Sequence, residues 1–177
     1  MGKIILIFAL ILSYNSFSQT AEEYYQSAKA KFQTDDVQGA IMDYTKVIEI
    51  SPNIYNAYFG RALAKEYIGD LRGAINDYTK VIALNPNSGV FYKERAKIKV
   101  KIKDYKGAIL DYTKSLQLDP DYTYTYYWRA KAKFLSKNYK EAILDYDKTI
   151  ELDGDEFGTA FYERGLSKIF LNKKNSG

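Results

Sequence analysis

Two charged residue types recur at a regular spacing, and they are the first candidates for chemistry. The aspartates are 34 residues apart, and the arginines are 34, 34 and 35 residues apart: Asp43, Asp77, Asp111 and Asp145; Arg61, Arg95, Arg129 and Arg164. A carboxylate beside a guanidinium could bind a polar substrate. A catalytic site is rarely copied four times, so the repetition favours ion pairs that hold helices together.

The ends of the two series predict which aspartate pairs with which arginine. Asp43 has Ser27 where an arginine would precede it, and no aspartate of the series follows Arg164. Pairing every aspartate with the arginine that follows it leaves no residue unmatched. This predicts four ion pairs across the junctions between repeat units: Asp43–Arg61, Asp77–Arg95, Asp111–Arg129 and Asp145–Arg164. Exposed pairs of this kind contribute about 0–1 kcal/mol each, so they would set register more than stability.

Other chemistry finds little support in the composition. The chain has no cysteine and no histidine, which removes thiol nucleophiles, the commonest metal ligand and the usual general base. The acidic run 153–156 could suggest calcium, but a calcium loop needs more oxygen ligands at set spacing, and a solvated turn is expected instead. The net charge of +4 comes from interspersed charges, which does not favour nucleic acid. We predict no enzyme activity, no metal and no cofactor.

An eight-residue motif, best seen at residues 107–114, organises the chain. Variants occur at 39–46, 73–80 and 141–148, and their tyrosines are spaced 34 residues apart: Tyr44, Tyr78, Tyr112 and Tyr146. Such a period indicates a stack of like units. We place units at 21–54, 55–88, 89–122 and 123–157, a terminal capping helix at 158–171 and a polar tail at 172–177.

Each unit reads as two helices. Apolar residues of the second helix recur at helical spacing, as Ala40, Tyr44 and Val47 do in the first unit. Residues 97–103 alternate between lysine and aliphatic residues as a strand would, but the same register holds good helix formers in other units. A stacked array cannot change the type of one unit, so we predict an all-α solenoid of antiparallel helix pairs.

This pattern resembles the tetratricopeptide repeat. The second and third units carry its aromatic, small and proline positions: Tyr58, Ala62, Ala74, Tyr78, Val81 and Pro86; Tyr92, Ala96, Ala108, Tyr112, Ser115 and Pro120. The resemblance covers about residues 21–171 and implies a concave groove that binds peptides or protein segments. One first-helix position departs from the family pattern, with lysine in place of a large aromatic: Lys31, Lys65, Lys99, Lys133 and Lys168. We expect their stems to cover apolar surface and their ammonium groups to reach water.

The resemblance implies which first-helix residues face the groove. The predicted groove residues are Tyr25, Lys29, Phe59, Tyr67, Lys93, Lys97, Lys101, Tyr127, Trp128 and Lys131. Lys93, Lys97 and Lys101 are four residues apart and form one stripe, which would favour a partner with an acidic segment. The alternative is that the lysines only keep an exposed face soluble. The lysine, asparagine and arginine clamp of chaperone-binding family members is not reproduced.

Residues 1–18 have the three-part layout of a secretory signal peptide. Lys3 gives a positive start, residues 4–12 are apolar, and Ser16 and Ser18 are small where a signal peptidase reads. The apolar run is too short to span a bilayer, which takes about 20 residues. We therefore expect export to a periplasm or the exterior, with Gln19 as the mature start and no integral membrane span afterwards.

These inferences together predict a non-enzymatic scaffold for protein–protein interaction. Two alternatives remain open: an enzyme or small-ligand binder that uses the groove, and a structural part that self-associates, since the sequence leaves the oligomeric state undetermined. The terminal helix should cap the array, because an open solenoid leaves its last apolar face uncovered. We expect Phe161, Leu166 and Ile169 to face inward and Glu163, Lys168 and Lys173 outward.

Overall fold

The computed structural model describes residues 19–153 and 157–175. Within these residues the chain forms helices joined by short turns and has no strand, which confirms the all-α prediction. The helices, in order, are α2 (Ala21–Gln33), α3 (Val37–Ile50), α4 (Tyr55–Tyr67), α5 (Leu71–Leu84), α6 (Gly89–Lys101), α7 (Tyr105–Leu118), α8 (Thr123–Leu135), α9 (Tyr139–Asp153) and α10 (Gly158–Asn175). The predicted signal peptide, and residues 154–156 of the acidic turn, lie outside the described residues.

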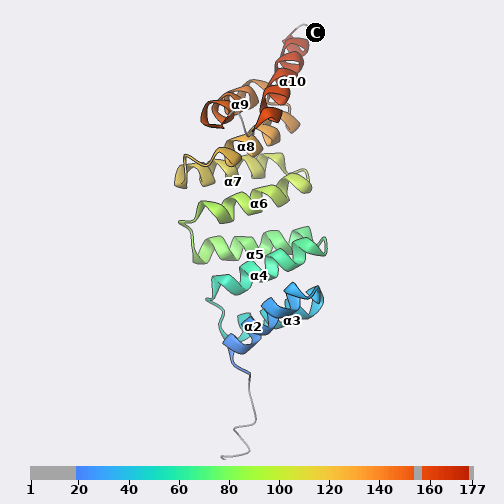
Figure 1. Ribbon diagram of the computed structural model, residues 1–177, viewed down its shortest axis with the longest axis vertical. Helices are drawn as coiled ribbons and strands as arrows, with labels where there is room; N and C mark the ends of the chain where they lie inside the picture. The colour runs from blue at the N-terminus through green and yellow to red at the C-terminus, as the bar shows by residue number, and fades with distance from the viewer. Residues whose placement is uncertain (1–18, 154–156, 176–177) are drawn as a thin grey trace, which may run out of the picture.

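The helices stack as antiparallel pairs along one long axis, with α2 and α10 at opposite ends of the stack (Figure 1). Contacts are most numerous within the pairs α2–α3, α4–α5, α6–α7 and α8–α9. The second helix of each pair also packs on the first helix of the next, so α9 packs on α10. The alternating lysine segment belongs to α6 as far as Lys101, so the array does not change type there.

An aspartate begins the second helix of the first three pairs. Asp36, Asp70 and Asp104 are N-caps whose side chains accept hydrogen bonds from the backbone N–H groups of Gly39, Gly73 and Gly107, at 2.9–3.0 Å. A carboxylate there satisfies a free N–H group at the helix start. A Cβ atom at any of these glycines would lie only 2.0–2.2 Å from the capping carboxylate, so a larger residue at these three positions would have to displace the cap.

The core is built from small and aromatic residues in a fixed register. Ala40, Ala74, Ala108 and Ala142 are fully buried, and so are Tyr78, Tyr112 and Tyr146. The alanines let neighbouring helices approach closely, and the tyrosine rings fill the space between them. No helix of the described residues is both long enough and apolar enough to cross a membrane.

The terminal helix α10 lies differently from the prediction. It ends at Asn175, beyond the expected 171, and its buried residues are Ala160 and Ser167. Phe161 and Ile169 are 48% and 51% exposed, so the inward orientation predicted for them is wrong. The register of the array places the small residues Ala160 and Ser167 against α9. Because successive residues of a helix point about 100° apart, Phe161 points away from the face that carries Ala160.

Candidate functional site

The repeated arginines and aspartates pair within units. Arg61 donates two hydrogen bonds to the carboxylate of Asp77, from Nε at 2.9 Å and from Nη2 at 2.7 Å. Its third bond, from Nη1 to Thr45 Oγ1 at 3.0 Å, crosses to the preceding unit. The next two units repeat this arrangement with Arg95–Asp111 and Thr79, and with Arg129–Asp145 and Thr113.

The prediction that these ion pairs cross the unit junctions is therefore wrong. The two ends of the array have other partners, so counting unmatched residues was misleading. Asp43 accepts hydrogen bonds from Ser27 Oγ and Lys31 Nζ, both at 2.6 Å. Arg164 pairs with Asp147 at 2.7 Å. Asp147 occupies the register of the threonines, so a carboxylate stands where the other units offer a hydroxyl.

The repeated first-helix lysines join the same network. Lys65, Lys99 and Lys133 lie 2.6–2.8 Å from the carboxylates of Asp77, Asp111 and Asp145, and their side chains are only 16–19% exposed. Their ammonium groups point to carboxylates and not, as predicted, to water. Each of these three aspartates thus receives an arginine and a lysine in a site with little solvent. The network joins the two helices of each pair.

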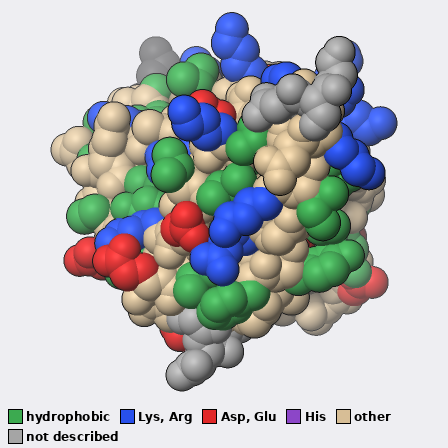
Figure 2. Space-filling model, turned by 90° about the horizontal axis from the view of Figure 1, so that it is seen from above, with side chains coloured by type: hydrophobic (Ala, Val, Ile, Leu, Met, Phe, Trp, Pro, Cys, Tyr) green, Lys and Arg blue, Asp and Glu red, His purple; other side chains and the backbone are tan. Residues whose placement is uncertain are grey.

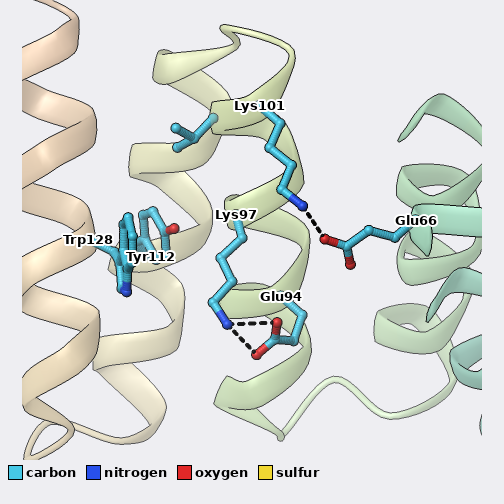
Figure 3. A pocket seen from close by; sticks show the side chains of 7 residues that line it. Glu66, Glu94, Lys97, Lys101, Tyr112 and Trp128 are labelled. Atoms are coloured by element: carbon cyan, nitrogen blue, oxygen red, sulfur yellow. Dashed lines mark hydrogen bonds and ion pairs between the residues drawn. The ribbon is translucent and has the colours of Figure 1, made fainter. Parts of the chain in front are cut away.

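The strongest candidate site is a groove formed mainly by first helices. A pocket of about 330 Å³ is lined by Glu66 of α4, Glu94, Lys97, Val100 and Lys101 of α6, Tyr112 of α7 and Trp128 of α8 (Figure 3). A second hollow of about 340 Å³ is lined by Phe32, Leu63, Glu66, Tyr67 and Lys101. The two hollows are neighbours, since Glu66 and Lys101 line both, and together we call them the groove.

The charges that line the groove are paired with one another. Lys97 Nζ lies 3.0 and 3.2 Å from the two carboxylate oxygens of Glu94, and Lys101 Nζ lies 2.6 Å from Glu66 (Figure 3). Further along, Lys131 Nζ lies 3.0 Å from Glu163. The predicted positive stripe is therefore largely neutralised by glutamates. The groove offers both donors and acceptors to a ligand.

The structure places only part of the predicted groove set at these hollows. Tyr67, Lys97, Lys101 and Trp128 line them. Lys93 instead lies over the ring of Tyr122, 4.3 Å from its centroid, with a side chain 12% exposed, so it does not extend the stripe. The other predicted residues, Tyr25, Lys29, Phe59, Tyr127 and Lys131, do not line the two hollows. Phe59 and Tyr127 pack against core tyrosines.

Of the residues that line the first hollow, four were absent from the predicted set: Glu66, Glu94, Val100 and Tyr112. Tyr112 is a fully buried core residue, and it also lines the first hollow. Its hydroxyl is buried and has no hydrogen-bond partner within the described residues, as is also true of Tyr78. In contrast, the hydroxyl of Tyr146 donates to Glu163 at 2.6 Å. Whether the hydroxyl of each tyrosine forms a hydrogen bond therefore depends on which residue faces it.

These tyrosines do not act as acids or bases near neutral pH. Burial, the largest cause, raises the pKa of Tyr44 to about 12. Burial also raises the pKa of Tyr112 well above its ordinary value, and the negative charge of Glu94 adds to the effect. A neutral phenol at Tyr112 is a hydrogen-bond donor at every physiological pH. Within the described residues no group of three or more acidic side chains could hold a metal ion.

Comparisons with known proteins agree with this architecture. The family model "Tetratricopeptide repeat" matches residues 21–54, 55–88, 92–122 and 123–156. A crystal structure of MamA protein superposes with a TM-score of 0.83 at 23% identity, covering 90% of this chain and 87% of that one. YrrB, described as a protein of this repeat family with an unusual peptide-binding site, gives 0.78 at 18% identity, covering 93% and 84%.

A third similar structure was solved with a peptide. The first repeat domain of Spaghetti (RPAP3), bound to the HSP90 peptide SRMEEVD, gives a TM-score of 0.62 at 25% identity, covering 67% of this chain and 93% of that one. No curated protein sequence is similar enough to count as a match. The family model covers most of the chain, and its four matched segments correspond to the four helix pairs. The chain therefore belongs to the tetratricopeptide repeat family.

Proposed function

We propose that this protein is a non-enzymatic scaffold that binds an extended peptide or protein segment in the groove between α4, α6 and α8. One observation carries the proposal. Trp128, the only tryptophan of the sequence, lines the groove beside Val100 and Tyr112, whose buried hydroxyl has no hydrogen-bond partner among the described residues. The peptide-binding neighbours support this use of the fold.

The lining of the groove indicates what the segment carries. Trp128 and Val100 offer apolar surface to one aliphatic or aromatic side chain, and such anchors commonly dominate peptide interfaces. The Lys97–Glu94 and Lys101–Glu66 pairs can share their donors and acceptors with main-chain amides. The best fit is a segment with an apolar anchor and little net charge.

An acidic segment is the second candidate, because the two lysine side chains are 39% and 54% exposed. A ligand carboxylate would have to compete with the glutamates that already hold these lysines. The two candidates differ in their response to salt. Binding through an apolar anchor depends only weakly on the salt concentration. Binding through lysines weakens as the salt concentration rises, because salt at 0.15 M screens exposed charges from one another beyond about 8 Å.

The groove should lose most of its affinity when Trp128 is removed. Peptides selected from a random display library against the full chain would be measured by titration at low and high salt. We expect Trp128→Ala to weaken them at least about tenfold at both salt concentrations, which is about 1.4 kcal/mol. The matched control is Met42→Ala, because Met42 is 69% exposed on α3 and lies outside the groove. The control should bind as the parent does.

The same titrations separate the remaining outcomes. If Lys97→Glu with Lys101→Glu abolishes binding at low salt only, the acidic segment is the ligand. If selected peptides bind Trp128→Ala as tightly as the parent, the groove is not the binding site and the proposal is wrong.

We also propose that the protein is exported, as the predicted signal at residues 1–18 indicates. The folded part is compatible with cleavage after Ser18. Thr20 caps α2, since its hydroxyl accepts from Glu23 N at 3.2 Å while its own N–H donates to Glu23 at 2.9 Å. A chain that begins at Gln19 keeps this capping box. Mass spectrometry of the protein from its native cell should find Gln19 at the N-terminus; an intact Met1 in membrane-free cytosol would contradict export.

A further inference from the structure

Helix α10 has the register of a first helix of a pair. Arg164 and Lys168 lie 35 residues after Arg129 and Lys133. Helix α10 packs on α9 in the same way as α4 packs on α3, α6 on α5 and α8 on α7. Within the described residues no second helix packs on the other side of α10. The surface that a partner helix covers in the four complete pairs is therefore open in α10.

The equivalent residues show what this surface normally contacts. In α8, Tyr127 packs against Tyr146 with ring centroids 6.0 Å apart, and Phe134 packs against Tyr139 at 5.5 Å. The residues of α10 in these two positions are Tyr162 and Ile169, which are 69% and 51% exposed. The two apolar side chains lie two turns apart on the same helix face. We call the surface formed by Tyr162, Gly165, Lys168 and Ile169 the open face.

The charge on the open face is also unmatched. Lys31, Lys65, Lys99 and Lys133 each pair with an aspartate of the second helix of their own pair, at 2.6–2.8 Å. Lys168 holds the same register, is exposed, and has no ion pair within the described residues. Arg164 is already paired with Asp147. The open face thus combines two apolar side chains with a lysine that lacks its carboxylate.

We propose that the open face docks an acidic amphipathic helix of another protein, which takes the place of a second helix. The four second helices of this chain indicate its chemistry. Each carries a small residue, an aspartate three positions later and a tyrosine directly after it, as in Ala142, Asp145 and Tyr146. In the partner, the small residue would allow close approach, the acidic residue would pair with Lys168, and the large residue would pack on Tyr162. This site is separate from the concave groove.

A second copy of this chain fits the open face poorly. Two α10 helices packed face to face would bring together cations from both copies, because α10 also carries Lys173 and Lys174, both exposed. The second helices with the matching pattern are already used inside each copy, where their aspartates are buried. In the end view of Figure 2, hydrophobic side chains lie among blue lysine and arginine side chains and some red acidic ones.

The test uses the chain's own second helix as the probe. A peptide with the sequence of residues 139–153 is stapled between positions 140 and 144, which are exposed in α9, so that it is helical when free. Its binding to the full chain is followed by fluorescence anisotropy. We expect saturable binding, and at least a tenfold loss with Lys168→Glu and with Tyr162→Ala. A peptide with lysine in place of Asp145 should bind the parent protein weakly. The same peptide should bind the Lys168→Glu variant more tightly, because the charges are again opposite.

The outcomes separate this inference from the groove. Trp128→Ala should leave binding of the stapled peptide unchanged, and Lys168→Glu should leave binding of groove peptides unchanged, so either site can fail alone. Absence of binding by the stapled peptide would overturn the inference. So would binding that is insensitive to both α10 variants, or light scattering that shows a dimer broken by Tyr162→Ala, since that would assign the open face to a second copy.

Discussion

Replacing Asp111 by alanine should lower the free energy of unfolding by about 3–5 kcal/mol, the cost of breaking a buried ion pair from one side. Asp111 accepts two hydrogen bonds from Arg95, at 2.8 and 2.7 Å, and lies 2.7 Å from Lys99. The arginine and lysine side chains are only 14% and 17% exposed. Without the carboxylate, two cations remain close together with little water. Urea denaturation followed by circular dichroism would measure the loss.

Asp43 supplies the matched control, because it holds the same register with a different set of partners. It contacts Lys31 and Ser27 but no arginine, and the Lys31 side chain is 38% exposed. This lysine can turn to solvent when the carboxylate is removed, so Asp43→Ala should cost less than Asp111→Ala. Asp147→Ala, at an exposed pair, should change stability by less than about 1 kcal/mol. Equal losses at Asp111 and Asp147 would show that the network is not solvent-poor.

The helices could be predicted from the sequence because the same pattern recurs in every unit, so each unit supports the assignment of the others. A local signal such as the alternating lysines of residues 97–103 favours a strand, but the 34-residue period requires every unit to have the same fold. The periodic positions of Ala108 and Tyr112 identified the buried face in the same way, and both are fully buried. Where the period ends, the inference weakened. α10 has no further unit with which to compare its register, and Phe161 and Ile169 were assigned to the wrong face.

The ion pairs were harder to predict because they depend on side-chain geometry rather than on spacing. Matching residues by number ignored Ser27, Lys31 and Asp147, which satisfy the two ends. The charges of the groove were missed for a related reason. Glu66 lies 35 residues before Lys101 and neutralises it, and such a contact between different first helices leaves no local pattern in the sequence. Trp128, Lys97 and Lys101 line the first hollow, whereas Lys93, which shares the predicted stripe of the two lysines, packs over Tyr122 instead, so helical register alone does not determine which residues line the groove.

The largest effect in the core is expected at Tyr112. Its ring is fully buried among Ala96, Ala108 and Ala132, beside Trp128 of the groove. Tyr112→Ala removes the ring from a site whose alanine neighbours are too short to fill the space. We expect a loss of about 3–5 kcal/mol in the free energy of unfolding, the range for large aromatic truncations in cores. Thermal and urea unfolding of the variant and the parent would measure it.

Tyr112→Phe is the control that separates the ring from its hydroxyl. The hydroxyl is buried without a partner within the described residues, so removing it should leave stability within about 1 kcal/mol of the parent or raise it, because an unsatisfied buried polar group costs about 1–3 kcal/mol. Tyr146→Phe should instead destabilise the protein, since it breaks the 2.6 Å bond to Glu163. If Tyr112→Phe weakens groove peptides while leaving stability unchanged, the hydroxyl is held for a ligand acceptor. A loss of stability as large as that of Tyr112→Ala would show that the hydroxyl is already satisfied in the folded protein.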